Sequence, residues 1–475
     1  SQPYPEAISR TSYARTTDGG ATWGVTSQPT PGKSNQTSTF ATERLDAPVV
    51  NLDGGLFRSQ ATVRVTIPEG TTLRYTTDGT TPTEKHGTVS SSGLFTVKST
   101  QIFRFRLFKE GYLPSRVVTR SYIITTREYH MPVISVVTDP INLYDDSLGI
   151  MTQGVNGIPG NGYDTPCNWN MDWERPANFE YFTTEGDMVV NQEATIERCG
   201  GWSRAWLPYS FKVKANKIYE GENFIPHQFF PNKAYLKHRT LQLRNGGNDN
   251  NSRIKDPALQ AIVHTSGLDV DGQECLPAVH YVNGAYKGLI NIREPNNKHF
   301  VEANYALDDD EIDQFEISPG IGYNQKCGTD ESFLHWGELS IYADDPDKYA
   351  EIRSMVDIDE YINYMAVELY LGSDDWPQNN AKAFKPIREG GKFRFVLFDL
   401  DHSFNLTSET FTTFAGKRSE SRLVGLFLNM LKNTEFRKQF IDTYCLVAGS
   451  VFVPERCNAI IDSMAQNTET VLFNK

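Results

Sequence analysis

Residues 358–404 constrain the fold more than any other stretch of this 475-residue chain. The apolar side chains of residues 358–372, IDEYINYMAVELYLG, recur mostly at the i, i+3, i+4, i+7 spacing that predicts an amphipathic helix. The polar loop SDDWPQNN follows directly, and it is followed by KFRFVLFDLDHSF, an apolar strand that ends in two aspartates. A helix, a polar loop and an acid-terminated strand in this order predict a mixed α and β domain.

The length of the chain exceeds what one ordinary hydrophobic core fills, so we expect two or three domains. Its composition is that of a folded protein, and no apolar run approaches the roughly 20 residues that a membrane span requires. The net charge of −13 opposes binding to a phosphate backbone. We therefore expect no nucleic-acid partner and no transmembrane segment. The six cysteines lack C-x-x-C pairing, which argues against a zinc site.

Two regions precede the mixed domain. Residues 1–40 are rich in Ser, Thr, Gly, Pro and Gln, and they read as a polar leader with one short strand near Trp23. Residues 41–126 instead contain short alternating strands between turn residues: TVRVTI, TLRYTT, LFTVKS, IFRFRLF and VVTRSYII. Five strands in about 80 residues predict a small immunoglobulin-like β-sandwich. We expect a spacer role for it, with glycan binding as the alternative.

Residues 127–475 form the mixed domain. Strands are predicted at MPVISVVT, NFEYFT, ATIERC, YSFKVKA, AVHYVNGAYKGLINIRE and KFRFVLFDL, and helices near 256–266, 358–372, 420–432 and 433–447. Antiparallel strands, then a helix, a polar loop and a strand ending in acid are the order of parts in a two-lobed kinase. The predicted fold class is therefore a multidomain protein, in which an all-β immunoglobulin-like sandwich precedes an α+β two-lobed atypical protein-kinase-like domain.

The polar loop after the 358–372 helix carries the strongest chemical signal. Asp375 and Asn380 keep the Asp-x-x-x-x-Asn interval that separates the base from a magnesium ligand in protein-kinase catalytic loops. Asp374 and Asn379 keep the same interval, which leaves the register open. An acidic calcium-type or solvated loop is the alternative interpretation.

The acid-terminated strand offers the second metal ligand of such a site. Asp399 and Asp401 both lie at its end. Because side chains alternate along a strand, we expect only one of these two carboxylates to face a metal, while the other points away or caps the turn. His402, which follows the pair, is interpreted as structural.

Phosphoryl transfer also needs a phosphate cradle and a cation. Arg198, Ser203 and Arg204 surround a Gly-Gly turn whose N–H groups can face an anion, and a plain turn is the alternative. Lys212, expected on the inner face of the strand YSFKVK, is chosen over Lys214 as the phosphate anchor. A second glycine turn, LRNGGND, either lines the same cleft or is structural. The same two interpretations apply to the strand end GLINIRE, a candidate connector between lobes that closes with Glu294.

Several motifs together resemble one family. RCGGWSR, YSFKVK, LRNGGND, GLDVDGQ, VNGAYKGLINIRE, DDWPQNN and FDLDHSF are similar, in the same order, to the motifs of the CotH family of spore-coat-protein-H-like atypical kinases, over about residues 128–475. LRYTTDGTTPT and FKEGYLPSRVVTRSY resemble the C-terminal module of chitobiases and β-hexosaminidases. The leader resembles the remnant of a lamin-tail-type domain.

The resemblance implies a distant kinase-like fold that binds ATP and Mg²⁺ and phosphorylates Ser or Thr of a protein acceptor. It also implies an extracellular or cell-surface location, although the sequence shown, beginning SQPYPEAISR, contains no signal peptide. The alternative function is a catalytically silent surface or coat protein on a kinase-like scaffold, attached to a glycan through the β-sandwich.

The residue roles that follow from this resemblance are specific. Asp375 is the catalytic residue, and the metal ligands are Asn380, Asp399 and Asp401. The cofactor-binding residues are Arg198, Ser203, Arg204 and Lys212, with which we group Glu294. Two positions depart from the family pattern: Tyr209 stands where a lysine often precedes the strand serine, and Cys199 stands where small or polar residues are usual.

Overall fold

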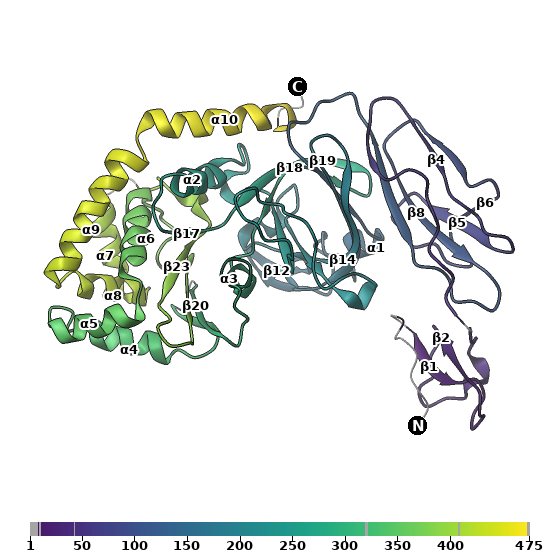
Figure 1. Ribbon diagram of the computed structural model, residues 1–475, viewed down its shortest axis with the longest axis horizontal. Coiled ribbons are helices and arrows are strands. Elements are labelled where there is room, and N and C mark those ends of the chain that lie inside the picture. Colours follow the sequence, from purple (N-terminus) through teal and green to yellow (C-terminus); the bar gives the residue numbers. More distant parts are fainter. Residues whose placement is uncertain (1–7, 9–10, 42, 319–321, 407–408, 473–475) are drawn as a thin grey trace.

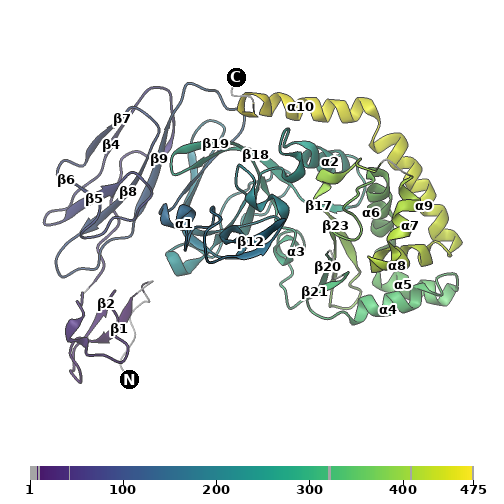
Figure 2. The ribbon, with the colours of Figure 1, turned by 180° about the vertical axis from the view of Figure 1, so that it is seen from behind.

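The computed structural model describes residues 8, 11–41, 43–318, 322–406 and 409–472. Figure 1 shows a small β-hairpin, a β-sandwich, a β-barrel and a region of sheet and helices in that order along the chain. The sandwich packs on one side of the barrel, and the helical region lies on the opposite side. The last helix runs back over this arrangement toward the barrel (Figure 2).

The N-terminal region is all β. A hairpin of β1 (Ser12–Arg15) and β2 (Trp23–Thr26) comes first. The sandwich has a five-stranded sheet in the order β3-β9-β8-β5-β6 and a two-stranded sheet, β4-β7. These strands are β3 (Gly55–Phe57), β4 (Ala61–Arg64), β5 (Thr72–Thr76), β6 (Thr88–Ser90), β7 (Leu94–Val97), β8 (Gln101–Phe108) and β9 (Val118–Ile124). Burial alternates strictly along β4, as the sequence pattern predicts for a sheet with one buried face.

A closed barrel of seven strands follows, in the order β10-β13-β14-β15-β16-β19-β18. The strands are β10 (Val133–Val137), β13 (Arg175–Phe182), β14 (Met188–Arg198), β15 (Phe211–Ala215), β16 (Thr240–Arg244), β18 (Cys275–Val282) and β19 (Ala285–Arg293). β10 closes the barrel by pairing in parallel with β18. α1 (Ile141–Tyr144) and a hairpin of β11 (Ile158–Gly160) and β12 (Tyr163–Cys167) lie in its loops. The barrel core is apolar and includes Phe179, Ile196, Phe211 and Leu241.

A second sheet of five strands, in the order β17-β23-β22-β20-β21, belongs to the helical region. Its strands are β17 (Asp271–Gly272), β20 (Ile312–Ile317), β21 (Asn324–Cys327), β22 (Ala381–Pro386) and β23 (Arg394–Leu397). The helices are α2 (Lys255–His264), α3 (Lys298–Tyr305), α4 (Glu331–Ser340), α5 (Pro346–Met355), α6 (Ile358–Leu371), α7 (Thr410–Gly416), α8 (Arg422–Met430), α9 (Thr434–Leu446) and α10 (Pro454–Leu472). The four predicted helices are thus confirmed within about two residues.

The apolar face of α6 explains why that helix forms and where it packs. Tyr361, Met365 and Leu369 are buried in the largest hydrophobic cluster of the molecule. Gly372, with a φ of 56°, ends the helix in the left-handed conformation that glycine adopts without strain. The polar loop therefore starts at a fixed point. None of the described helices is long and apolar enough to cross a membrane.

Buried hydrogen bonds join the sandwich to the barrel. The Glu180 carboxylate on β13 accepts from the Ser121 amide of β9 at 3.0 Å, and the Ser121 hydroxyl bonds to that of Ser135 at 2.8 Å. Asn191 Nδ2 donates to the Thr119 carbonyl at 2.8 Å. Because unpaired polar groups are costly in a buried seam, these bonds fix one contact geometry.

Candidate functional site

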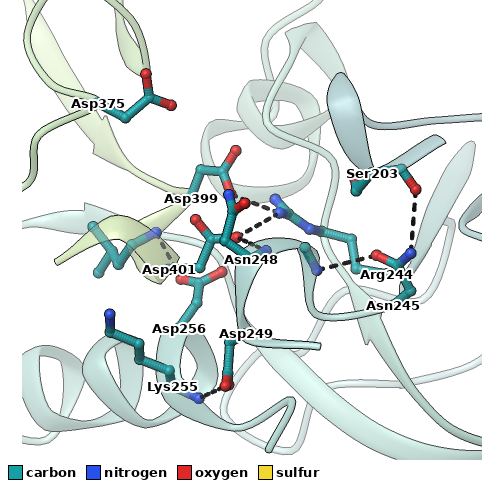
Figure 3. Close-up of polar contacts among 12 residues, drawn as sticks. Ser203, Arg244, Asn245, Asn248, Asp249, Lys255, Asp256, Asp375, Asp399 and Asp401 are labelled. Atoms are coloured by element: carbon teal, nitrogen blue, oxygen red, sulfur yellow. Dashed lines mark hydrogen bonds and ion pairs between the residues drawn. The ribbon is translucent and has the colours of Figure 1, made fainter. Parts of the chain in front are cut away.

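The two aspartates after β23 meet an arginine from the barrel. β23 ends at Leu397, Asp399 has a left-handed backbone with a φ of 58°, and residues 400–402 form a single 3-10 turn. Arg244 Nη2 lies 2.6 Å from Asp399 Oδ1 and 3.6 Å from Asp401 Oδ2 (Figure 3). The prediction that only one of these aspartates faces the site is therefore wrong, because the chain leaves the strand before alternation can separate them.

The electrostatics of this triad differ between the two carboxyls. Burial alone would raise the pKa of Asp399, but the charge and hydrogen bond of Arg244 outweigh it and hold that pKa below its usual value. Burial, together with the neighbouring Asp399 charge, raises the pKa of Asp401 to about 6. Asp399 is therefore the member of the pair that stays ionised most readily.

The glycine turn after β16 approaches the same pair. The Asn248 amide donates to Asp401 Oδ2 at 2.9 Å. Gly247 has a φ of 57°, and a Cβ built there would lie 2.3 Å from Asp401 Oδ2 and 3.0 Å from Arg244 Nη2. Only a residue without a side chain permits this approach. The LRNGGND turn therefore contacts the aspartate pair directly.

Helix α2 supports the turn from below. Asp249 Oδ2 accepts from the Lys255 amide at 2.7 Å at the start of that helix. Asp256 Oδ1 accepts from the Leu400 amide at 3.2 Å, and its other oxygen forms a buried ion pair with Arg293. Sequence reasoning missed Asp256, because an acid in the first turn of a helix is ordinary.

Asp375 is held by the two asparagines that follow it. Its Oδ2 accepts from Asn379 Nδ2 at 3.0 Å and from Asn380 Nδ2 at 3.1 Å. Asp374 instead bonds to His402 Nδ1 at 2.7 Å. Burial raises the pKa of Asp375. The sequence left two registers open, one with Asp374 and one with Asp375. In the structure both asparagine amides bond to Asp375.

Arg198 is a buried cation on the first glycine turn. Its Nη1 donates to the Ser210 carbonyl at 2.8 Å, and its guanidinium lies 4.5 Å from the centre of the Tyr209 ring. Its Nε and Nη2 are buried with no hydrogen-bond partner among the described residues. Burial lowers its pKa to about 9. Arg198 pairs opposite Phe211 of the barrel core and is fully buried, so its guanidinium faces the inside of the barrel.

Ser203 and Arg204 connect the two glycine turns. Asn245, next to Arg244, donates from Nδ2 to the Ser203 carbonyl at 3.3 Å (Figure 3). Arg204 forms a 3.1 Å ion pair with Asp172 and donates from Nε to the Gly200 carbonyl at 2.7 Å. The predicted phosphate-side turn is therefore anchored directly beside the Arg244 triad.

Lys212 lies on the outer face of the barrel, not on the inner face as the sequence predicted. Phe211 and Val213, its neighbours on β15, fill the barrel core, and alternation sends Lys212 and Lys214 to the other side. Lys212 Nζ is 2.8 Å from Glu197 Oε1, and Lys214 pairs with the same carboxylate. Strand alternation therefore gives no reason to prefer one lysine.

Glu294 belongs to a separate buried network where the chain leaves the barrel. Its Oε2 is 2.6 Å from Lys233 Nζ and accepts from the Glu274 amide at 2.8 Å. Asn304 on α3 donates to its other oxygen at 3.2 Å. The structure does not bring Glu294 into contact with the aspartates of the triad.

Lys382 is a partly buried lysine that sequence reasoning missed, and its Nζ lies 3.6 Å from Glu316 Oε1. It follows Asn380 by two residues, and its Nζ lies 3.1 Å from Asn296 Oδ1 and 5.0 Å from the centre of the Phe398 ring. Phe398 immediately precedes Asp399, so Lys382 lies between the Asp375 loop and the triad. Burial lowers its pKa. In the sequence it reads as one more alternating strand lysine, which usually faces solvent.

Residues 196–474 match the family model described as CotH kinase protein. The chain belongs to the CotH kinase protein family. The match includes the first glycine turn, the Arg244 triad and the Asp375 loop of this CotH chain. Residues 52–119 match the model of the chitobiase/beta-hexosaminidase C-terminal domain, which confirms the predicted module in the N-terminal region. No curated protein matches the chain.

The residues of this CotH chain can be compared with what Mg²⁺ and ATP require. No group of three or more His, Cys, Asp or Glu side chains in the described part of the chain is arranged to hold a metal. Magnesium that binds together with nucleotide phosphates needs only one or two protein carboxylates, which Asp399 and Asp401 supply. The space beside Gly247 is filled by Asp401 and Arg244, and Arg198 lies inside the barrel. The carboxylate pair therefore fits a magnesium ion.

Proposed function

We propose that the chain is a secreted or cell-surface atypical kinase that transfers the γ-phosphate of ATP to Ser or Thr of a protein acceptor in a Mg²⁺-dependent reaction. The barrel and the helical region would be the two lobes of a kinase-like fold. Family membership supports this proposal. The observation that carries it is the meeting of Asp399 from one region with Arg244 from the other, close to an Asp375 that two amides orient.

Each residue has a chemical role in this proposal. Asp375 orients the acceptor hydroxyl and takes its proton, and its raised pKa makes it a better base than an exposed aspartate. Asn380 and Asp399 would hold magnesium, which neutralises phosphate charge when bound. Asp401 would support Asp399 beside the Asn248 amide.

The cationic side chains differ in how well they could contact the phosphates of ATP. Arg198 has buried nitrogens without partners in the described structure, and Ser203 and Arg204 lie on its turn. Lys212 stays a candidate, although Glu197 neutralises it on the outer face. Lys382 lies beside Phe398 and is the cation that we place nearest the nucleotide. Glu294 would act only through the strand end that connects the barrel to the helical region, because Lys233, the Glu274 backbone amide and the Asn304 side chain occupy its oxygens.

The test measures transfer of labelled phosphate from ATP in the presence of MgCl₂, with the chain itself and a mixture of Ser/Thr-rich proteins as acceptors. We expect incorporation by the wild type and by Asp344→Asn, a change to an exposed aspartate outside the site. Asp375→Asn and Asp399→Asn should lose it while keeping the wild-type far-UV circular dichroism spectrum. Wild-type incorporation by both variants would show that the proposed chemistry is wrong.

Two observations favour a second function, a catalytically silent surface or coat protein. Arg244 already neutralises Asp399, and Tyr209 stands where the family often has a lysine. A scaffold of this kind would not bind ATP, so ATP with Mg²⁺ would leave its melting temperature unchanged. A binding-competent protein would instead gain RT ln(1 + [L]/Kd) in stability.

A further inference from the structure

A polar cavity of about 530 Å³ lies between the sandwich and the barrel. The sandwich packs on the side of the barrel that faces away from the helices (Figure 1), so this cavity is separate from the Arg244 triad. Clefts between packed domains are common ligand sites, because two walls can contact one ligand. None of the residues that line this cavity takes part in the proposed kinase chemistry.

The sandwich wall supplies donors. Arg104 on β8 is 7% exposed, donates from Nη1 to the Gly79 carbonyl at 3.1 Å, and has a buried Nε without a partner in the described residues. The Nε of Arg44, which precedes β3, is also buried without a hydrogen-bond partner in the described residues. Both arginines line the cavity, and Arg106 joins them. These two Nε–H groups are buried from solvent, so they reach a ligand only if the arginine side chains turn toward the cavity.

The barrel wall supplies acceptors and a ring. Glu220 Oε1 is 2.7 Å from Arg44 Nη2, and Glu193 Oε1 is 3.6 Å from Arg104 Nη2, so ion pairs cross the cleft. Asp139, Asn142 and Tyr219 complete this wall. The three arginines and three carboxylates of the lining balance in charge. A strongly charged ligand would find no net complementary field there.

Two further cavities lie along the same boundary. One of about 580 Å³ shares Arg44 and Glu220 with the first, and another of about 250 Å³ shares Glu193 and Glu220. We call these three neighbouring cavities the junction groove. Donors and acceptors recur along both walls.

We propose that the junction groove binds a neutral oligosaccharide. Sugar hydroxyls donate and accept together, and this property matches walls where arginines and asparagine stand beside carboxylates. Tyr219 would contact the apolar face of one sugar ring. A peptide, whose apolar side chains would contact Leu113, Val117 and Ile141 of the lining, is the alternative that the test separates. The groove needs both walls, so the sandwich alone would not bind.

The test uses the full chain and three probes: cellohexaose, chitohexaose and a hexamer of galacturonic acid. Isothermal titration should show binding of at least one neutral hexamer. Tyr219→Ala and Glu220→Gln should weaken that binding at least tenfold, while Tyr342→Ala, which changes an exposed tyrosine on the helical side, should not. Circular dichroism checks that the variants fold.

Three results would overturn the proposal. These are the absence of binding by both neutral hexamers, binding of only the acidic one, and wild-type affinity in both groove variants. Competition by a Ser/Thr-rich acceptor peptide that Tyr219→Ala abolishes would assign the groove to a protein partner instead. Asp375→Asn should keep full oligosaccharide affinity, so failure of the kinase proposal leaves this one standing.

Discussion

Arg244 and Asp399 lie 155 residues apart in the chain and 2.6 Å apart in space, where they join the barrel to the acid-terminated turn of the helical region. The contact places a cation where the proposed chemistry needs magnesium. Arg244 therefore either supports the metal ligand or competes with the metal for it. The two roles predict different responses to MgCl₂.

Replacing Arg244 by Met should lower the free energy of unfolding by about 2 kcal/mol. The cost should stay below the 3–5 kcal/mol of a fully buried pair, because Asp399 retains some exposure. With the guanidinium gone, Asp399 and Asp401 repel each other, and a divalent cation relieves that repulsion. MgCl₂ should thus raise the melting temperature of Arg244→Met more than that of the wild type in differential scanning fluorimetry. An equal rise in both proteins would exclude the competition role.

Gly247→Ala should damage the site through a single methyl group. The new Cβ would lie 2.3 Å from Asp401 Oδ2 on a backbone with a φ of 57°, so both a clash and backbone strain oppose it. We expect a loss of about 1–3 kcal/mol in stability and loss of any phosphate transfer. Gly337→Ala on α4 is the matched control, because no atom lies within 4 Å of its added Cβ. That change should stabilise the helix by about 0.5–1 kcal/mol in urea unfolding.

The sequence predicted elements well and side-chain directions poorly. α6 and most of the barrel strands follow from local apolar spacing and formed where that spacing placed them, but β16, which carries Arg244, was not predicted. The prediction that only one of Asp399 and Asp401 faces the site was wrong, because the left-handed backbone at Asp399 ends the strand. No sequence pattern indicates such a backbone conformation at an aspartate. The prediction that Lys212 lies on the inner face of its strand was wrong for a related reason. Which face of β15 points inward depends on closure of the barrel.

Long-range partners were beyond sequence reasoning altogether. The LRNGGND and DLD motifs were both recognised, yet nothing local indicates that Arg244 bonds to Asp399. Asp256 and Lys382 were missed because their importance comes only from what the fold packs around them. The geometry of such a site is a property of tertiary packing, whereas its residue types are readable in the sequence.

Replacing Lys212 and replacing Lys382 should affect the affinity for ATP to different extents. Lys382 lies between the Asp375 loop and Phe398, so Lys382→Met should weaken ATP binding about tenfold in the presence of MgCl₂. Lys212→Met should change it less than threefold, because Glu197 lies 2.8 Å from that lysine, whereas Glu316 lies farther from Lys382 Nζ, at 3.6 Å. Titration with a fluorescent ATP analogue measures both. The reverse order would restore Lys212 as the phosphate anchor.

Glu180 should make the sandwich–barrel contact sensitive to pH. Burial raises its pKa to about 7 from a usual value of 4.5, so the folded protein holds a proton that the unfolded chain releases. Stability should thus be highest below about pH 4.5 for this group and fall as the pH rises toward 7, by roughly 3 kcal/mol in total. Glu180→Gln should remove that part of the slope in melting curves recorded from pH 4.5 to 8. A slope unchanged by the substitution would show that Glu180 does not titrate across this range.

Asp374 and Asp375 provide the sharpest test of the register. Both stand five residues before an asparagine, but only Asp375 receives both amides, while Asp374 bonds to His402. If Asp375 is the base, Asp375→Asn should lower the rate of phosphate transfer by about 10²–10⁴. Asp374→Asn should lower it less than tenfold, since that side chain is half exposed and turned toward His402. The two variants differ by one position and preserve the same hydrogen-bonding shape, and equal melting temperatures would exclude unequal folding as the source of a difference. A larger loss in Asp374→Asn would assign the chemistry to the other register.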